Sequence, residues 1–223
     1  MTLDKSAFIE FLLECNVLQF GEFTLNSGRR SPYFFNLGNV SDGAAYAQLG
    51  RAYAQTIIDS GVEFDVLFGP AYKGIPIAVA TAVALAEQGR CVGVAYNRKE
   101  AKDHGEGGLL VGAPVSGRVL LVDDVLTSGK ALRAAVTLIQ QAGATIAGAV
   151  IAMDREEVLA RDDVEAAEHR TAVSVLADEL AAPVVSIANL RDLIEFLEQS
   201  GQQGAEPTLE RMRDYQTRFC LVH

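Results

Sequence analysis

The sequence predicts an α/β fold, with a central, mostly parallel sheet and helices on both of its faces. The candidate strands are short runs of nearly continuous Val, Leu and Ile, such as residues 119–122, which is typical of strands buried on both faces. Segments of helical length follow several of these runs, so strands and helices alternate along the chain. The length of 223 residues and the hydrophobic content of 49% suit one well-packed domain spanning residues 1–223.

The spacing of apolar residues assigns the elements one after another. Residues 8–15 have helical spacing and predict an amphipathic first helix. Residues 21–36 combine aromatic, β-branched and turn residues, which predicts short strands or a hairpin. We expect residues 1–40 to form a small cap and residues 44–60 to form a helix. The later elements are a strand, loop and helix at 64–89, a strand at 91–99, a strand, loop and helix at 118–143, a strand at 145–155, and a strand and helix at 182–199.

Charge and cysteine content argue against several classes of protein. The formal net charge of -10 disfavours a general binder of nucleic acid or anionic membranes, since such proteins need a basic surface. Cys15, Cys91 and Cys220 are scattered, so the sequence encodes neither a disulfide framework nor a zinc site. The N-terminal segment has acidic residues within its apolar pattern, unlike a signal peptide, and no apolar run reaches the roughly 18 residues of a membrane span. We therefore expect a soluble, cytoplasmic protein that binds neither nucleic acid nor membranes.

The segment VLLVDDVLTSGKA, residues 119–131, is the most informative about chemistry. An apolar strand delivers Asp123 and Asp124 to its C-terminal end, where parallel sheets bind ligands. These acceptor-only carboxylates suit ribose hydroxyls or a sugar with developing positive charge. Backbone N–H groups of residues 127–130 open the next helix and favour a phosphate, which Gly129 allows to approach closely. A plain Thr-Ser-Gly helix cap is the alternative, and the two aspartates before it make that alternative less favourable.

This segment resembles the phosphoribosyl diphosphate signature of type I phosphoribosyltransferases, in which hydrophobic residues precede two acidic residues and a Thr/Ser-Gly loop. Three further segments in the same chain order make the resemblance specific to the orotate phosphoribosyltransferase family. They are GEFTLNSGRRSPYFFN at residues 21–36, FGPAYKGIP at 68–76 and NRKEAKDHGEGG at 97–108. The resemblance runs from the first helix to about Arg155 and is weaker beyond it.

The resemblance implies a type I phosphoribosyltransferase fold whose residues 1–40 form a cap, or hood, over the base site. It implies transfer of ribose 5-phosphate from phosphoribosyl diphosphate to orotate, which yields orotidine 5′-monophosphate and pyrophosphate in pyrimidine biosynthesis. It implies Mg²⁺ as cofactor, bound mainly through the diphosphate and the ribose hydroxyls and without dedicated protein ligands. It also implies a homodimer.

The basic stretch at residues 97–108 has a use in such a reaction. Its cationic donors would lie where negative charge develops on pyrophosphate, and the glycines after them would let the segment close as a lid. The family implies that this lid reaches the active site of the partner subunit. A solvated, charged hairpin is the alternative interpretation. The donors are Arg98, Lys99, Lys102 and His104.

The remaining motifs divide between the two substrates. Tyr72 and Lys73 follow a strand in a tight glycine loop, which is an ordinary turn if taken alone and a diphosphate site by resemblance. Phe34 and Phe35 are core residues by burial tendency, and by resemblance they flank the orotate. Arg155 could pair with the orotate carboxylate in a bidentate contact, or form a surface ion pair.

The resemblance thus implies a complete set of site residues. The catalytic members are Lys102, His104, Asp123 and Asp124. The substrate-binding residues are Asn26, Phe34, Phe35, Tyr72, Lys73, Arg98, Lys99, Lys102, His104, Asp123, Asp124, Val125, Leu126, Thr127, Ser128, Gly129, Lys130, Ala131 and Arg155.

One position departs from the family pattern. The family usually has lysine where this sequence has Asn26, and an amide cannot supply positive charge to the diphosphate. Either Arg29 or Arg30 compensates, or affinity for the donor is weakened. The acidic stretch at residues 154–170 has no clear motif and is interpreted as a solvated loop or helix.

Two other functions remain as alternatives. A purine-specific transferase would keep the fold and the donor, but Arg155 and the Phe34–Phe35 pair disfavour it. A regulator that senses the donor and binds RNA or DNA is disfavoured by the intact basic stretch and by the negative net charge.

Overall fold

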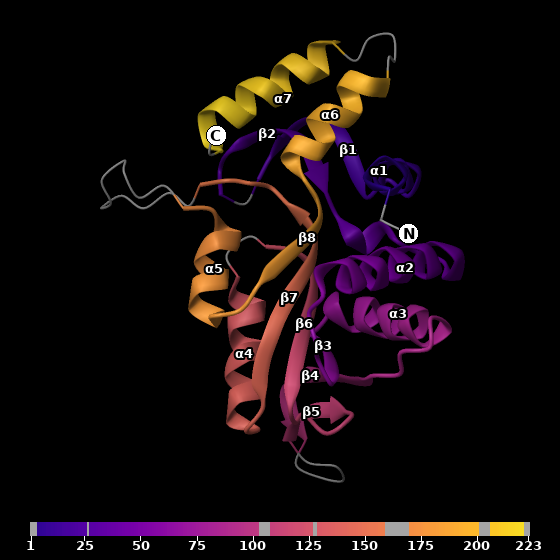
Figure 1. Ribbon diagram of the computed structural model, residues 1–223. Helices are drawn as coiled ribbons and strands as arrows, with labels where there is room; N and C mark the ends of the chain where they lie inside the picture. Colours follow the sequence, from indigo (N-terminus) through magenta and orange to yellow (C-terminus); the bar gives the residue numbers. More distant parts are fainter. Residues whose placement is uncertain are drawn as a thin grey trace, which may run out of the picture.

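The central sheet has the strand order β5-β4-β3-β6-β7-β8 (Figure 1). The computed structural model describes residues 4–25, 27–102, 108–126, 129–158, 170–200 and 206–220, with the backbone alone at 101 and 102. The strands of this sheet are β3 (Val66–Gly69), β4 (Gly93–Lys102), β5 (Gly108–Gly112), β6 (Arg118–Val125), β7 (Thr145–Asp154) and β8 (Val184–Asn189). All neighbouring strands in it are parallel except β4 and β5, which are antiparallel. The predicted mostly parallel sheet is therefore confirmed.

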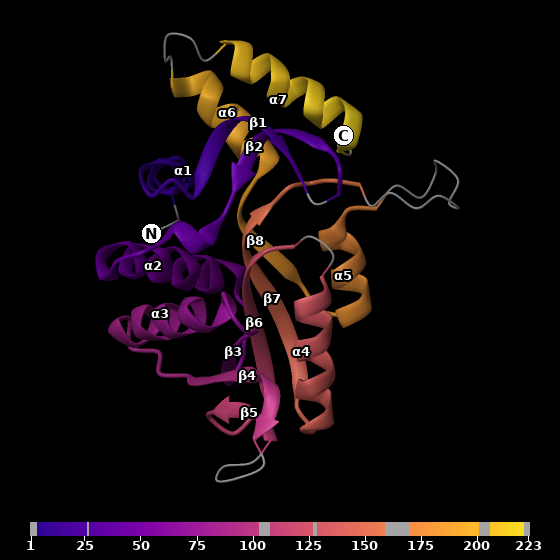
Figure 2. The ribbon, with the colours of Figure 1, turned by 180° about the vertical axis from the view of Figure 1, so that it is seen from behind.

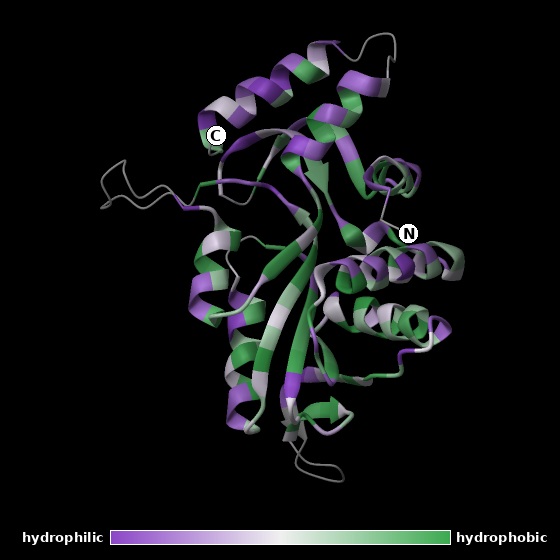
Figure 3. Ribbon diagram, in the orientation of Figure 1, coloured by the Kyte–Doolittle hydropathy of each residue, from purple (hydrophilic) through white to green (hydrophobic). Residues whose placement is uncertain are grey.

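Helices cover both faces of this sheet. The helices are α1 (Lys5–Glu14), α2 (Gly43–Ser60), α3 (Gly74–Glu87), α4 (Lys130–Gln141), α5 (Ala172–Leu180), α6 (Leu190–Ser200) and α7 (Glu206–Phe219). Figures 1 and 2 show α2 and α3 on one face and α4 and α5 on the other. Successive β6 residues explain this arrangement, because Leu120 and Val122 pack toward the first pair while Val119 and Leu121 pack toward the second. Figure 3 accordingly shows the central strands as mostly hydrophobic.

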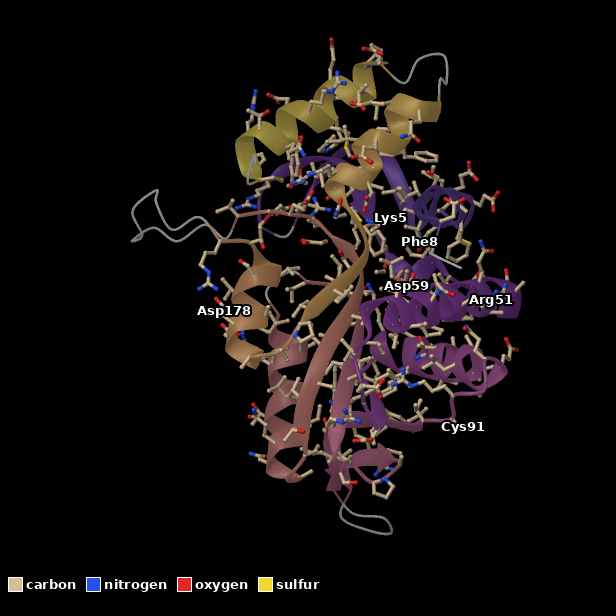
Figure 4. All side chains as sticks on the ribbon, viewed as in Figure 1. Lys5, Phe8, Arg51, Asp59, Cys91 and Asp178 are labelled. Carbon is tan, nitrogen blue, oxygen red and sulfur yellow. The ribbon has the colours of Figure 1, made fainter. Side chains whose placement is uncertain are left out.

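The N-terminal and C-terminal segments together build the end of the molecule beyond β8. There α1 and the antiparallel hairpin of β1 (Leu18–Thr24) and β2 (Arg30–Phe35) lie beside α6 and α7 (Figure 1). Lys5, labelled in Figure 4, forms an ion pair with Asp192 of α6 at 2.9 Å. Tyr33 of β2 packs edge-on against Tyr215 of α7, with ring centroids 6.2 Å apart. The predicted cap region therefore shares its end of the protein with the C-terminal helix.

The structure changes the predicted elements in two places. The sequence pattern predicts neither the helices α5 and α7 nor the strand β5. The strand predicted at 91–99 is longer than expected, because β4 continues to Lys102 and pairs it with Gly108, the first residue of β5. The described part of the basic stretch therefore forms two arms of an antiparallel hairpin. Within the described ranges, none of the helices has the length and apolarity needed to cross a membrane.

Candidate active site

Three adjacent strands bring the predicted site residues to one edge of the sheet. Because β3, β6 and β7 are parallel neighbours, their carboxyl ends lie side by side. Residues 70–73 follow β3, Asp123 and Asp124 lie near the end of β6, and Arg155 directly follows β7. Ligands of such sheets bind at this edge, so it is the candidate active site.

The acidic pair is buried and fixed by backbone hydrogen bonds. Asp123 Oδ1 accepts from the N–H of Asp124 at 3.0 Å, and Asp124 Oδ1 accepts from the N–H of Val125 at 2.8 Å. Tyr53 of α2 donates to the carbonyl oxygen of Asp123 at 2.6 Å. Burial, followed by the neighbouring charge of Asp124, raises the pKa of Asp123 to about 7. Asp123 is therefore close to half protonated at neutral pH.

The ammonium group of Lys73 contacts two other side chains near the carboxyl end of the sheet. Its Nζ forms an ion pair with Asp124 Oδ2 at 2.7 Å and donates to Asn36 Oδ1 at 3.2 Å. The Lys73 side chain is 46% exposed, so an incoming anion can reach it. Lys73 and Asp124 therefore neutralise each other, and any anion that binds Lys73 must compete with Asp124 for the ammonium group.

The loop that carries Lys73 requires glycine at its start. A Cβ built on Gly69 would lie 2.0 Å from the carbonyl oxygen of Gly74, which no side chain can tolerate. The close approach of these two backbone segments turns the chain directly from β3 into α3. Lys73 and Tyr72 are thereby held at the carboxyl end of the sheet.

Two contacts join this loop to the first arm of the basic hairpin. Asn97 Oδ1 accepts a hydrogen bond from the N–H of Ala71 at 3.1 Å. The ammonium group of Lys99 lies 4.7 Å from the ring centroid of Tyr72, whose side chain is exposed. The predicted diphosphate ligands of the two segments are therefore neighbours.

The helix after the acidic pair offers backbone donors. Its N-cap residue is Gly129, with φ +65° and no side chain to cap the first turn. The N–H groups of Lys130 and Ala131 lie in that first turn, where an anion is favoured. Val125 ends β6, and Leu126 is buried against α4.

Only some of the other predicted ligands lie within the described residues. Arg98 and Lys99 lie on β4, in the first arm of the hairpin. The Lys102 side chain and the residues Asn26, His104, Thr127 and Ser128 lie outside the described part of the chain. Their roles stay predictions.

The two phenylalanines at the end of β2 have different environments. Phe34 is 37% exposed and stacks on Phe23 of β1, with ring centroids 5.4 Å apart. Phe35 is buried in the main core. Because successive residues of a strand point to opposite faces, the two rings cannot stack on the same base. Phe34 offers a stacking surface, while the side chain of Phe35 packs as a core residue.

Arg155 lies in a polar cluster between β2 and α7. Its Nε donates to Glu157 Oε1 at 2.5 Å, and its Nη2 donates to Ser31 Oγ at 2.9 Å and to the Tyr215 hydroxyl at 3.2 Å. The guanidinium carbon lies 4.2 Å from the ring centroid of Tyr33. Burial works to lower the pKa of Arg155, but its interactions with Tyr33, Glu157 and Tyr215 outweigh burial and raise the pKa above the ordinary value. Arg155 therefore stays charged although it is buried.

The two arginines proposed to compensate for Asn26 have different environments. Arg29 Nη1 forms an ion pair with Glu157 at 2.8 Å, and its Nη2 donates to the carbonyl oxygen of Val158 at 2.9 Å. Its guanidinium also lies over the Phe219 ring. Arg30 is exposed and lines a cavity of about 390 Å³ between the hairpin and α7. Arg29 is thus held by residues 157, 158 and 219, and Arg30 is the candidate that remains.

Three members of the Arg155 cluster were not predicted from the sequence: Ser31, Glu157 and Tyr215. The interpretation of residues 154–170 as solvated is wrong at its start, because Arg155 is buried and Glu157 is largely shielded. Local spacing does not indicate the contact between Arg155 and Glu157, since β7 ends at Asp154 and Glu156 between them has a positive φ of 53°, which breaks the alternation of a strand. Tyr215 is distant in the sequence, and only the tertiary fold brings it to Arg155.

The acidic pair is compatible with magnesium that arrives with the substrate. Among the described residues, no three acidic, histidine or cysteine side chains gather as a metal site. Mg²⁺ commonly uses one or two carboxylates together with substrate phosphates and retains several waters. Asp123 and Asp124 provide such oxygens, although Lys73 competes for Asp124. These residues fit a diphosphate-bound ion better than a metal held by the protein alone.

Comparisons with known proteins identify the family. The pattern of the Phosphoribosyl transferase domain matches residues 36–179. An orotate phosphoribosyltransferase of Ralstonia pickettii is 53% identical over 215 residues, covering 96% of this chain and 95% of that protein. The crystal structure of the Francisella tularensis orotate phosphoribosyltransferase is 38% identical, with a TM-score of 0.83 over 96% of this chain and 100% of the other.

A more distant relative has been solved with a phosphorylated sugar bound. The Mycobacterium tuberculosis orotate phosphoribosyltransferase in complex with 5-phospho-α-D-ribosyl 1-diphosphate is 25% identical, with a TM-score of 0.60. The alignment covers 85% of this chain and 99% of that one. The fold and family predicted from the sequence are thus confirmed, and this chain belongs to the orotate phosphoribosyltransferase family of type I phosphoribosyltransferases.

Proposed function

We propose that this chain transfers ribose 5-phosphate from phosphoribosyl diphosphate to orotate, forming orotidine 5′-monophosphate and pyrophosphate in pyrimidine biosynthesis. One observation carries the proposal: three kinds of group meet at one edge of the sheet. They are a buried acidic pair for the ribose, a cationic loop for the diphosphate, and a buried arginine for the carboxylate of the base. Membership of the family agrees with this assignment.

Each substrate has its own set of ligands in this proposal. The diphosphate binds to Tyr72, Lys73 and the basic hairpin with Arg98, Lys99, Lys102 and His104. The ribose hydroxyls contact Asp123 and Asp124, and the 5-phosphate lies on the backbone donors of residues 125–131. Orotate lies against the hood at Phe34, while Phe35 supports that surface from the core. Its carboxylate binds Arg155, and Thr127 is a second contact to orotate. Asn26 stands at the family's donor lysine position.

In this proposal the protein catalyses the reaction by placing charged side chains next to the atoms on which the opposite charge develops. Departure of pyrophosphate leaves positive charge on the ribose, which the acidic pair stabilises, while the basic hairpin stabilises the leaving polyanion. Closing the hairpin over the site excludes water and brings orotate and the anomeric carbon together. Mg²⁺ on the diphosphate would neutralise part of its charge and help it to leave. The protein forms no covalent intermediate.

The absorbance of orotate tests the reaction directly. Mixing the protein with orotate, phosphoribosyl diphosphate and Mg²⁺ is expected to reduce the ultraviolet absorbance of orotate. Uracil, hypoxanthine and adenine are assayed in parallel by pyrophosphate release and are expected to give none. Turnover of a purine would keep the donor site but overturn the assignment of the base, and inactivity with every base would favour a donor-sensing regulator.

The assembly proposed with this function is a homodimer in which the basic hairpin completes the partner's site. Val79 and Val83 are one helical turn apart on α3 and are 48% and 56% exposed. Such an apolar stripe suits a self-complementary contact across a two-fold axis. We also place the enzyme in the cytoplasm, with residues 1–40 serving as a hood on a single domain.

Mixed dimers test whether the hairpin acts across subunits. Lys102→Ala and Asp124→Asn subunits are each expected to be nearly inactive alone. In a hybrid dimer, the intact hairpin of one subunit would serve the intact acidic pair of the other, so a random mixture should regain about a quarter of wild-type activity. A hairpin that acts within its own subunit would give no recovery.

A further inference from the structure

The guanidinium group of Arg155 is held on three sides by different parts of the chain. Glu157 follows it along the chain, Ser31 lies on the hood hairpin, and Tyr215 lies on the C-terminal helix α7. The ring of Tyr33 lies against the guanidinium carbon at 4.2 Å. These three hydrogen bonds and the ring contact fix both the position and the plane of the group.

Glu157 is the centre of this arrangement. Its Oε1 accepts from Arg155 Nε and from the Tyr215 hydroxyl, both at 2.5 Å, and its Oε2 accepts from Arg29 Nη1 at 2.8 Å. The charges of the two arginines and the hydroxyl of Tyr215 hold the pKa of Glu157 below its ordinary value, although burial opposes them. One carboxylate between two guanidinium groups leaves a net positive charge, so the cluster can still accept an anion.

The cluster leaves a defined part of Arg155 for a ligand. A guanidinium group has five N–H donors, and the three hydrogen bonds to Glu157, Ser31 and Tyr215 use those of Nε and Nη2. In the described part of the chain no acceptor bonds Nη1. The two N–H donors of Nη1 can therefore reach a carboxylate without displacing a protein group.

We propose that Glu157 and Tyr215 are positioning residues of the base site, and that α7 through Tyr215 is a functional part of it. They hold Arg155 so that its Nη1 edge faces the carboxylate of the bound base. This inference rests on the proposed role of Arg155 in binding orotate. Arg155 is ordered before the base arrives, so binding costs little side-chain entropy.

The difference in affinity for two nucleotides tests this inference. Orotidine 5′-monophosphate carries the carboxylate and uridine 5′-monophosphate lacks it, so the ratio of their dissociation constants measures the carboxylate contact alone. Titration of the wild-type protein is expected to show tighter binding of the nucleotide with the carboxylate. Equal affinity for both, in the wild type, would remove the proposed role of Arg155 and with it the proposed function.

Glu157→Gln and Tyr215→Phe then test the positioning role. An amide cannot accept from both arginines, because one of its two terminal atoms is a donor. Glu157→Gln should reduce the preference for the carboxylate nucleotide about tenfold, and Tyr215→Phe about threefold, as expected for lost hydrogen bonds to a charged group. Affinity for uridine 5′-monophosphate should stay unchanged in both variants. A wild-type preference that survives both substitutions would overturn the inference.

Arg213→Gln is the matched control. It removes an ion pair between α7 and Glu198 of α6, at 2.7 Å, without touching the cluster. Its preference for the carboxylate nucleotide should equal that of the wild type. An equal loss in Arg213→Gln would mean that α7 acts only through general packing, which contradicts the proposed role of Tyr215.

Discussion

The donor side and the base side of the site prepare for their ligands in different ways. On the donor side, Lys73 and Asp124 form an ion pair at 2.7 Å. Lys73 is proposed to bind the diphosphate and Asp124 the ribose, so two residues meant for different parts of the donor neutralise each other in the free protein. On the base side, Arg155 is fixed by Glu157 and Tyr215 and keeps its Nη1 donors for a ligand. Donor binding must break an internal ion pair, whereas base binding need not.

The difference matches the sizes of the two substrates. Phosphoribosyl diphosphate offers many charged oxygens and can offset the loss of one ion pair by contacts along the whole loop. Orotate is small and presents one carboxylate, so most of its affinity must come from a group that is already in place. Substitutions on the two sides should therefore have different signatures.

The largest effect is expected in the pH dependence of stability, on the donor side. The pKa of Asp123 is raised to about 7, so between the unfolded pKa near 3.8 and pH 7 the folded protein holds a proton that the unfolded chain has lost. Its stabilising contribution is present at low pH and is lost as the pH rises through 7. Compared with Asp123→Asn, the wild type should lose roughly 3 kcal/mol of unfolding free energy between pH 5 and pH 8.

Urea denaturation of the two proteins at pH 5, 6, 7 and 8 measures this loss. Burial also raises the pKa of Asp154, to about 6, but Asp154 is present in both proteins and its titration cancels in the difference. A difference that does not change with pH would mean that Asp123 titrates normally, and the buried acidic pair would then carry its full charge at neutral pH.

On the base side, Arg155→Lys should lower kcat/KM for orotate about a hundredfold, since an ammonium cannot copy the planar contacts of a guanidinium group. The KM for phosphoribosyl diphosphate should change little. Steady-state kinetics with each substrate varied in turn separates the two parameters. If both substrates lost affinity equally, Arg155 would be holding the site together rather than binding the base.

On the donor side, Lys73→Met should weaken binding of phosphoribosyl diphosphate by only about tenfold, because the lost contact is partly offset by the ion pair that no longer has to break. Isothermal titration with the donor and Mg²⁺ gives the dissociation constant. The salt dependence provides a control, since the wild type should lose more affinity than the variant as ionic strength rises. A loss as large as that of Arg155→Lys would show that the internal pair costs nothing to break.

The donor side could be predicted from the sequence more completely than the base side. The donor side lies within continuous segments, so Asp123, Asp124 and Lys73 follow from a strand, a loop and a helix in sequence order. The base side is assembled from segments far apart, and neither Glu157 nor Tyr215 has a local pattern that indicates its contact with Arg155. The different environments of Phe34 and Phe35 could have been predicted, because successive residues of a strand point to opposite faces.

The smallest effect concerns Asn26. Arg29 is bound to Glu157 and the carbonyl oxygen of Val158, so it cannot move to the diphosphate without breaking these two contacts. Arg30 is exposed and could compensate only in part. Asn26→Lys should therefore tighten binding of phosphoribosyl diphosphate by about threefold, the modest gain expected of one exposed charge.

Two variants of Arg30 decide how much compensation occurs. If Arg30 supplies the missing charge, Arg30→Gln should weaken donor binding in the wild type and have a smaller effect once Asn26→Lys is present. If Arg30 lies apart from the donor, the two substitutions should be additive, since residues without a shared partner do not couple. An Asn26→Lys protein with unchanged or weaker affinity would mean that this site reaches the diphosphate without the family lysine, through the basic hairpin and Lys73 alone.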